Sequence, residues 1–531
     1  MLYRWASVGV FSVLLLSACA RGGAGTGAEL ATEAEHEHQQ AELGEVEFPI
    51  SCDDEAREAF ETGLAQLHHM MYEHALPQFQ AAAEADSECA MAHWGIAMAS
   101  FQPLWHPTRD EDMARGKAAI DAAQRIGAPT ARERGYIAAA RAFFTDPEPP
   151  APDRPTDHER RIEAWKAAQR ELHERYPEDV DAAALYALSE VAYAMTQFSP
   201  EEEHDYARER RAGALLERYF EDHPEHPGLY HYLIHAYDSP ELAHRAEAVA
   251  RAYDELAPET THALHMPSHI LVRLGEWEET AELNERAAEA ALHHPVNGRV
   301  SIHYPHALDY MMYAYLQLGE SEAARETLEA VWDIDAAQPD FASAYGLAAP
   351  QARYVLEQRL WEEAAGLEPG IPEALDWEAF PAAEALFHYA RGLGAARTGD
   401  LEQADAEREN IEARVAALRA EGDLYWAYMT EALADAVGAW VLYERGRADE
   451  AVALMEEAAD LEESMDKHPI TPGEVLPVRE LYGELLLLEG RAEEAHAAFQ
   501  ASLERTPNRR LALIGAERAA DAASGELGGS P

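Results

Sequence analysis

The amino-acid sequence predicts an all-α protein, an α-solenoid of helical hairpins, and three observations lead to this. From Asp53 onward Ala, Leu, Glu and Arg dominate, and apolar residues recur at three- and four-residue spacing between Gly or Pro breaks. No segment alternates polar and apolar residues as a half-buried strand does. Gly and Ala also recur in a fixed register, which indicates a stack of similar units.

The clearest repeat covers residues 478–507, VRELYGELLLLEGRAEEAHAAFQASLERTP. Its small and aromatic residues occupy the positions that are typical of a tetratricopeptide repeat (TPR). Gly483 and Ala495 are small where two helices cross, and Phe499 fills the gap between neighbouring units. Gly490 and Pro507 end the first and second helix. The predicted fold is therefore a solenoid of TPR-like hairpins that forms a right-handed superhelix.

The same register recurs along most of the chain. It predicts N-terminal TPR-like units at 53–144, a Pro-rich acidic loop at 145–157, and a central and C-terminal solenoid at 158–525 that ends in a capping helix at 511–523. Between 130 and 215 the helical pattern remains but the register is lost. The repeat positions are Gly63, Ala75, Phe79 and Ala82, then Gly275, Ala281 and Ala288, Gly319 and Ala324, Ala352 and Ala364, Gly392, Gly399 and Ala404, and Gly446, Ala451 and Ala458.

The first residues predict export and a lipid anchor. Arg4 precedes an apolar run at 8–16 that is shorter than the ~20 residues needed to span a bilayer, and this pattern fits a secretory signal peptide at 1–18. The sequence LSAC at 16–19 resembles a bacterial lipobox, which makes Cys19 the predicted lipidation site. An ordinary signal peptide with an incidental Cys19 is the alternative. Residues 19–47 are small and polar and predict a flexible tether.

The anchor and the cysteines predict a location in the cell envelope. Ala20, rather than Asp, follows Cys19, and the lipoprotein resemblance then implies the outer membrane of a Gram-negative cell, facing the periplasm. Cys52 and Cys89 are the two cysteines that remain, and in an oxidising compartment they predict a disulfide bond. Two buried free thiols are the alternative.

The charge balance restricts the partners. The chain has a formal net charge of −57, and its three lysines stand at 117, 166 and 467. Such a chain repels nucleic acid and anionic lipid surfaces, so membrane contact is predicted through the lipid anchor only. The sequence contains no phosphate-binding Gly loop, nucleophile elbow or HExxH signature.

Beyond the repeats, the chain resembles a family of bacterial TPR proteins of the cell envelope. The resemblance extends over almost the whole mature chain and implies the architecture, but no settled biochemical role. It rests on CAMAHWG at 89–95, LWHP at 104–107, HALHMPSH at 262–269, HPITPG at 468–473 and PVRE at 477–480.

Histidines are concentrated between residues 231 and 306. His231 and His235 are four residues apart and Asp238 lies three further on, which places all three on one helical stripe with Cβ atoms ~5–6 Å apart. Such a stripe can bind a metal ion, or the carboxylate can orient an imidazole ligand. The loop at 468–473 is a second candidate, although a structural turn is the favoured interpretation. The alternative for the histidines themselves is buried packing.

A second set of histidines surrounds Pro267. His265 and His269 differ by four, and His262 precedes them by three. Because Pro267 favours the first turn of a helix, we expect the helix to begin near Met266, with His262 and His265 in the connecting loop.

Successive first helices line the concave face of such repeats, so side chains from neighbouring units can meet there. His235, His269 and His306 come from three consecutive units and could face one another. Three histidines with an open position suit Zn²⁺ or copper, although no cofactor follows from the sequence with certainty.

The sequence supports two functions. The first is a binding scaffold rather than an enzyme: a lipid-anchored solenoid whose concave groove engages a protein or peptide partner in the cell envelope. The alternative is a metal-binding protein or metal-dependent enzyme that uses the central histidines.

Overall fold

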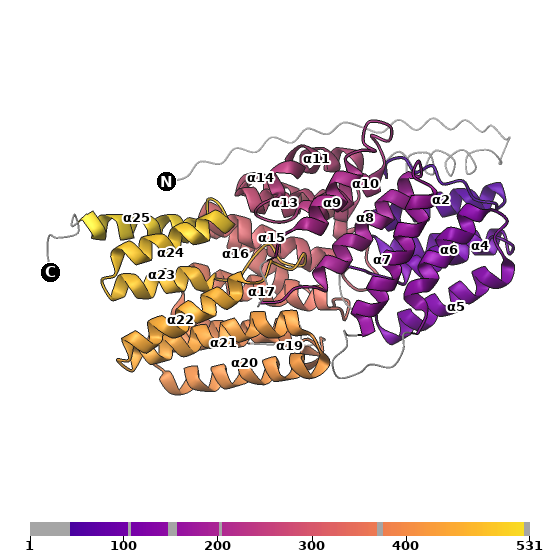
Figure 1. Ribbon diagram of the computed structural model, residues 1–531. Coiled ribbons are helices and arrows are strands. Elements are labelled where there is room, and N and C mark those ends of the chain that lie inside the picture. The colour runs from indigo at the N-terminus through magenta and orange to yellow at the C-terminus, as the bar shows by residue number, and fades with distance from the viewer. Residues whose placement is uncertain (1–42, 105–107, 147–156, 201–203, 369–374, 525–531) are drawn as a thin grey trace, which may run out of the picture. The chain divides into compact units, whose positions relative to one another are not determined.

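The computed structural model describes residues 43–104, 108–146, 157–200, 204–368 and 375–524, which belong to one compact unit. The regular structure of these residues is helical, with two isolated β-bridges and no strand. Consecutive helices pack as hairpins, and each hairpin packs against the next along the chain (Figure 1). The predicted all-α solenoid of TPR-like hairpins is confirmed, and the hand of its superhelix stays a prediction.

The first half of the described chain contains four hairpins. They are α2 (Asp54–His68) with α3 (Tyr72–Ala85), α4 (Ala90–Ala99) with α5 (Asp110–Ile126), α6 (Ala131–Phe144) with α7 (Asp157–Arg175), and α8 (Val180–Met195) with α9 (Ala207–Leu216). Because α6 packs against α7, the described helices continue as one array from one side of residues 147–156 to the other.

The central hairpins carry the predicted histidines. They are α10 (Pro227–Tyr237) with α11 (Ala243–Leu256), α12 (Thr261–His265) and α13 (Pro267–Leu274) with α14 (Trp277–Leu292), α15 (His303–Leu318) with α16 (Ser321–Trp332), and α17 (Phe341–Glu357) with α18 (Trp361–Ala365), followed by the 3₁₀ turn η1 (Trp377–Ala379). In the second of these hairpins α12 and α13 together form the first helix.

The C-terminal hairpins end in a single helix. They are α19 (Pro381–Thr398) with α20 (Leu401–Glu421), α21 (Leu424–Glu444) with α22 (Ala448–Glu463), and α23 (Val478–Leu488) with α24 (Ala492–Arg505), followed by α25 (Arg510–Ser524). The predicted capping helix is α25. It packs mainly on α24, and it also touches α15 in the central repeats.

At both ends of the array the phenylalanine of the repeat packs against glycines of the neighbouring helices, as predicted. A Cβ on Gly483 would lie 2.8 Å from the Phe499 ring, and a Cβ on Gly515 would lie 2.4 Å from it. Phe499 therefore fills the space between α23 and α25, and only glycine lets those helices approach so closely. Phe79 has the same relation to Gly95 of α4, whose Cβ would lie 2.1 Å from its ring.

The N-terminal segment is anchored to the fold from residue 43, which corrects the predicted extent of the tether. Leu43 and Phe48 are buried, and the Glu45 amide donates a hydrogen bond to the Glu225 carbonyl at 2.8 Å. Val46 and Ile50 also pack against the core, so these apolar side chains together hold the segment against the repeats. The signal peptide, Cys19 and the rest of the tether lie outside the described residues, as do 147–156 of the predicted loop.

The predicted disulfide is present between Cys52 and Cys89, which are 37 residues apart in sequence. Cys52 precedes α2 and Cys89 caps α4, so the bond joins the first two hairpins. Closing a loop of this length contributes about 4 kcal/mol in the chain-entropy model. Within the described residues, no helix combines the length and the hydropathy that crossing a bilayer requires.

The loop between α22 and α23 crosses the first helices of five consecutive hairpins, and we call residues 466–476 the inner loop. Each of those helices supplies one side chain that binds a loop residue. Arg273 of α13 binds the Asp466 carboxylate, and four others donate to loop carbonyls: Tyr310 of α15 to Thr471, Arg353 of α17 to Gly473 and Glu474, Tyr389 of α19 to Leu476, and Tyr425 of α21 to Asp466. The chain itself therefore covers this inner surface.

Candidate metal centre

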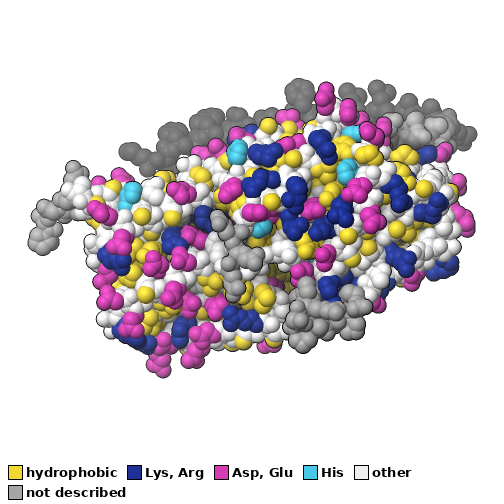
Figure 2. Space-filling view, in the orientation of Figure 1, with side chains coloured by type: hydrophobic (Ala, Val, Ile, Leu, Met, Phe, Trp, Pro, Cys, Tyr) yellow, Lys and Arg dark blue, Asp and Glu magenta, His cyan; other side chains and the backbone are white. Residues whose placement is uncertain are grey.

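Six histidines from four helices converge inside the central repeats. They belong to α10, α12, α13 and α15, the first helices of three successive hairpins, and all six are buried. They form two groups of three, in each of which one ring nitrogen per residue lies within 4.8 Å of the others. The first group is His231, His235 and His262, and the second group is His265, His269 and His306. Histidine is sparse on the face shown in Figure 2.

The helical turn before Pro267 corrects the prediction that His262 and His265 lie in a loop. Met266 keeps a helical backbone, with φ −56° and ψ −36°, and its amide donates to the His262 carbonyl at 2.9 Å. Proline disfavours a helical residue before it but does not forbid one, and here tertiary packing prevails. The sequence placed Pro267 correctly in the first turn of α13. As a result, His265 and His269 lie one turn apart.

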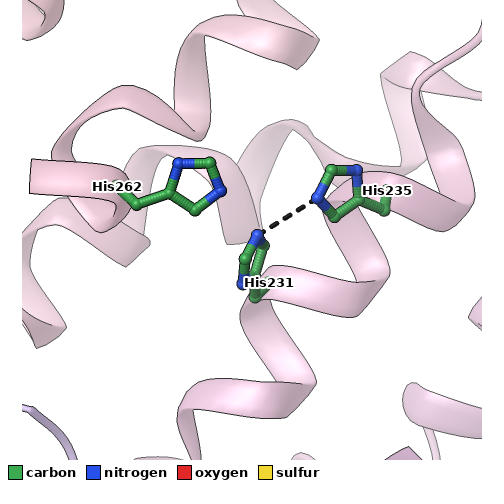
Figure 3. Close-up of side chains that lie close together, drawn as sticks. All are labelled: His231, His235 and His262. Carbon is green, nitrogen blue, oxygen red and sulfur yellow. Dashed lines mark hydrogen bonds between the residues drawn. The ribbon is translucent and has the colours of Figure 1, made fainter. Parts of the chain in front are cut away.

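The first group is built around His231. Its Nδ1 lies 2.6 Å from the carbonyl oxygen of His68, which can only accept, so Nδ1 carries the proton and Nε2 offers a lone pair. That Nε2 lies 3.1 Å from Nε2 of His235. Figure 3 shows the rings of His235 and His262 on opposite sides of His231. Nδ1 of His235 has no hydrogen-bond partner among the described residues.

In the second group, hydrogen bonds to residues outside the group determine which ring nitrogen of His265 and of His269 carries the proton. Nδ1 of His265 lies 2.7 Å from Oδ1 of Asn284, and the Asn284 amide nitrogen donates to the Thr280 carbonyl at 2.7 Å, which establishes the amide orientation. Nδ1 of His269 lies 2.9 Å from the Asp238 carboxylate. Both Nδ1 atoms are therefore donors. In a neutral ring the proton is then absent from Nε2.

The two Nε2 atoms of this group, which both offer lone pairs, face each other at 3.0 Å. Two lone pairs at this separation repel unless a cation lies between them. Ligand nitrogens at 2.0–2.1 Å around a tetrahedral metal ion are about 3.3 Å apart, close to the observed spacing. A proton shared by His265 and His269 is the alternative, and burial opposes it because a charged imidazole loses its hydration.

Burial keeps the clustered histidines in the form that binds metal. It lowers the pKa of His231 and His265 well below the usual value, and the neighbouring histidines lower it further. Burial likewise lowers the pKa of His269, although the hydrogen bond to Asp238 opposes the change. Neutral imidazoles with an available Nε2 are the usual metal ligands in proteins.

Asp238 has a different position from the one predicted. It follows the last residue of α10 rather than extending the stripe of His231 and His235. Its carboxylate accepts from His269, from Arg273 Nε at 3.0 Å and from Lys467 Nζ at 2.7 Å. Burial would raise its pKa, but Lys467 and Arg273 outweigh burial and hold that pKa well below the usual value. Asp238 therefore orients His269, in the manner of a carboxylate behind a metal-bound imidazole.

The inner loop closes the cluster, so it is more than the structural turn that the sequence favoured. His468, Pro469 and Ile470 join Leu104 around a cavity of ≈ 20 Å³. Each group of histidines also contributes two residues to the lining, His235 and His262 from the first group and His269 and His306 from the second. The two groups thus share one small space.

A third buried group was not predicted. His68, Asp181 and His226 come from distant parts of the chain, and both imidazole Nε2 atoms lie near Oδ1 of Asp181, at 2.8 and 3.2 Å. The Tyr232 hydroxyl lies 3.1 Å from Nδ1 of His68 and can donate to it. Burial would raise the pKa of Asp181, but hydrogen bonds from His226 and His68 lower it below the usual value. Ordinary hydrogen bonds account for this group.

Sequence spacing found the six histidines and Asp238, which orients His269, but it missed Asn284 and Lys467. Asn284 carries no signal in the sequence, because its role depends on α14 packing beside α12. Lys467 is one of three lysines in the chain, and this rarity was the available signal. His303 is a further buried histidine, with its ring centroid 5.0 Å from that of His262.

In comparisons with known proteins, the chain is similar to several solved structures. No model of a protein family matches the chain, and no curated protein matches it. The human IFIT1 dimer with PPP-AAAA is 14% identical, with 92% of this chain and 99% of that one covered and a TM-score of 0.37.

Two further solved structures are similar in the same way. The APC/C hetero-tetramer Cut9–Hcn1 is 11% identical over 88% of this chain and 97% of that one, with a TM-score of 0.30. A tetratricopeptide repeat protein from Parabacteroides merdae is 12% identical over 66% of this chain and 98% of that one, with a TM-score of 0.26. These TM-scores are low, and the fold assignment rests on the hairpins themselves.

Proposed function

We propose that the protein binds two transition-metal ions in its central repeats, one in each group of three histidines. The supporting observation is the pair of Nε2 atoms of His265 and His269, 3.0 Å apart, whose rings already donate through Nδ1 to Asn284 and Asp238. A metal ion is the partner that such a pair lacks. His306 supplies the third ligand of that group.

The donor set restricts the metal. Imidazole suits Zn²⁺ and copper, whereas Mg²⁺ and Ca²⁺ prefer oxygen ligands that these groups do not offer. Three histidines leave a coordination position open, as in sites that bind a further ligand. Asp238 and Asn284 supply the outer hydrogen bonds that fix the ring orientation in metal sites.

Metal content tests the proposal directly. We expect the full chain, purified without a His tag, to contain two metal ions per molecule by elemental mass spectrometry. His269→Ala should remove the ion of the second group and retain that of the first, which also shows that the variant is folded. His244→Ala, on the exposed side of α11, is the matched control and should retain both ions.

A metal-free protein would contradict the proposal if Zn²⁺ and copper also left its thermal stability unchanged. Any ion that binds the folded chain alone must stabilise it, by about 4 kcal/mol at a thousandfold excess over the dissociation constant. The absence of that shift excludes a site emptied during purification.

We also propose that the protein is a lipoprotein of the cell envelope, anchored through Cys19. The disulfide between Cys52 and Cys89 supports an oxidising compartment. We expect Cys19→Ser to move the protein from the membrane fraction to the soluble fraction of lysed cells. Recovery of the wild-type protein in the soluble fraction would contradict the anchor.

Any protein or peptide partner would bind outside the surface that the inner loop covers.

A further inference from the structure

We infer that the two groups of histidines form one dinuclear copper centre that holds two Cu⁺ ions and binds dioxygen between them. This inference rests on the proposed metal binding and specifies its metal and ligand. It is drawn from the shared cavity, from the charge balance around the histidines and from the side chains that close the space.

The shared cavity sets the size of the ligand. His235 and His262 approach it from the first group, and His269 and His306 from the second, so an ion in either group borders the same space. The cavity measures ≈ 20 Å³, and a single water needs about 10–15 Å³ on this measure. It therefore has room for a molecule of one or two heavy atoms.

The charge balance favours monovalent ions. The neutral imidazoles contribute no charge, and the negative charge of Asp238 already has two cationic partners, Lys467 and Arg273. Asp466 also pairs with Arg273, so these four side chains sum to zero. Two Zn²⁺ ions would place four uncompensated positive charges in a buried site, whereas two Cu⁺ ions place two. The lower charge costs less, because burying unpaired charge is strongly unfavourable.

The closing side chains favour ligand binding over hydrolysis. Leu104, Pro469 and Ile470 are apolar, and among the described residues that line the cavity none carries a carboxylate. His468 also lines the cavity, but its Nδ1 accepts from the Ile470 amide at 3.2 Å, so the proton of the neutral ring lies on Nε2 and no lone pair is left for a base. Metal-assisted hydrolysis ordinarily needs a general base that can reach the bound water. Asp238, the nearby carboxylate, already accepts from His269, Arg273 and Lys467.

Dioxygen satisfies the electron balance without any other reactant. Each Cu⁺ donates one electron and becomes Cu²⁺, and the dioxygen accepts both and becomes peroxide with its O–O bond intact. No proton moves and no bond of the protein changes. Two Cu⁺ with dioxygen carry the same total charge as two Cu²⁺ with peroxide, so the buried site need not accommodate a change in net charge.

The test uses the full chain loaded with Cu⁺ under anaerobic conditions. After excess copper is removed, copper is counted, oxygen is added and its uptake is measured with an electrode. We expect two coppers per chain and one dioxygen per two coppers, without hydrogen peroxide in solution. Two bound coppers without oxygen uptake would overturn this inference and leave the metal-binding proposal standing. Failure to bind copper or zinc would overturn both.

Two variants separate the cavity from the metal ligands. Ile470→Phe fills the cavity without removing a ligand, so it should retain two coppers and lose oxygen uptake. Leu513→Phe, on the exposed side of α25, is the matched control and should keep both properties. His262→Ala should retain the copper of the second group and lose oxygen uptake, because one Cu⁺ cannot supply two electrons. Oxygen uptake that persists in Ile470→Phe would contradict binding in the cavity.

Discussion

Replacing Arg509 with methionine is expected to lower the free energy of unfolding by about 3–5 kcal/mol, because it leaves buried charges without a partner. Arg509 precedes α25 and is fully buried. Its guanidinium binds the buried carboxylates of Glu357 and Glu480 and donates to the Tyr313 hydroxyl at 3.0 Å. Chemical denaturation followed by circular dichroism measures the loss.

The control for this change lies on α25, the helix that follows Arg509. Arg518 is exposed, so Arg518→Met should change the free energy of unfolding by less than about 0.5 kcal/mol. Adding Glu357→Gln and Glu480→Gln to Arg509→Met should recover part of the stability, since the unpaired charges are then gone. Equal effects of Arg509→Met and Arg518→Met would show that the buried network has no net role.

Replacing Asp238 with asparagine is expected to weaken metal binding in the second group by about 10–100-fold, since the outer partner of His269 is altered. The first group does not depend on Asp238 and should keep its affinity. Competition with a coloured chelator measures the two sites separately. The change also leaves Lys467 and Arg273 without their shared carboxylate, so we expect the melting temperature to fall.

Asp254→Asn is the matched control for this prediction. Asp254 lies on α11 and pairs with Arg286 at 2.6 Å near the surface, so its loss should leave both metal sites unchanged. A purely structural role for Asp238 predicts that both groups lose affinity together. That result would contradict its assignment to His269.

The fold could be predicted from the sequence because its signals are local. Gly483 and Phe499 identify the helix crossing within one repeat, and their spacing carries over to the other units. The predicted flexible tether extended too far along the chain, because its last residues include apolar side chains that pack on the fold. Leu43 and Phe48 are too isolated to form a periodic pattern, yet both are buried.

The site could be predicted from spacing along one helix and from the stacking of successive first helices, which brings His235, His269 and His306 to the same cavity. The four-residue intervals of His231 and His235, and of His265 and His269, survive in the structure. Asp238 matched the same spacing, but α10 ends before it, and its contacts depend on residues from other hairpins. Lys467 reaches it from 229 positions away in sequence. Contacts of that range depend on how the repeats stack, which periodicity does not specify.

The inner loop has a consequence for how the central and C-terminal repeats unfold. In most repeat arrays each unit touches only its neighbours, so units can open one after another from an end. Here the same short segment is held by Arg273, Tyr310, Arg353, Tyr389 and Tyr425, one from each of five hairpins. Opening any one of these hairpins breaks its hydrogen bond to the inner loop and so disturbs the segment that the other four hairpins also bind. These five hairpins are therefore expected to unfold together, with the all-or-none cooperativity of a globular domain, and the second group of histidines, on α12, α13 and α15, lies within that cooperative part.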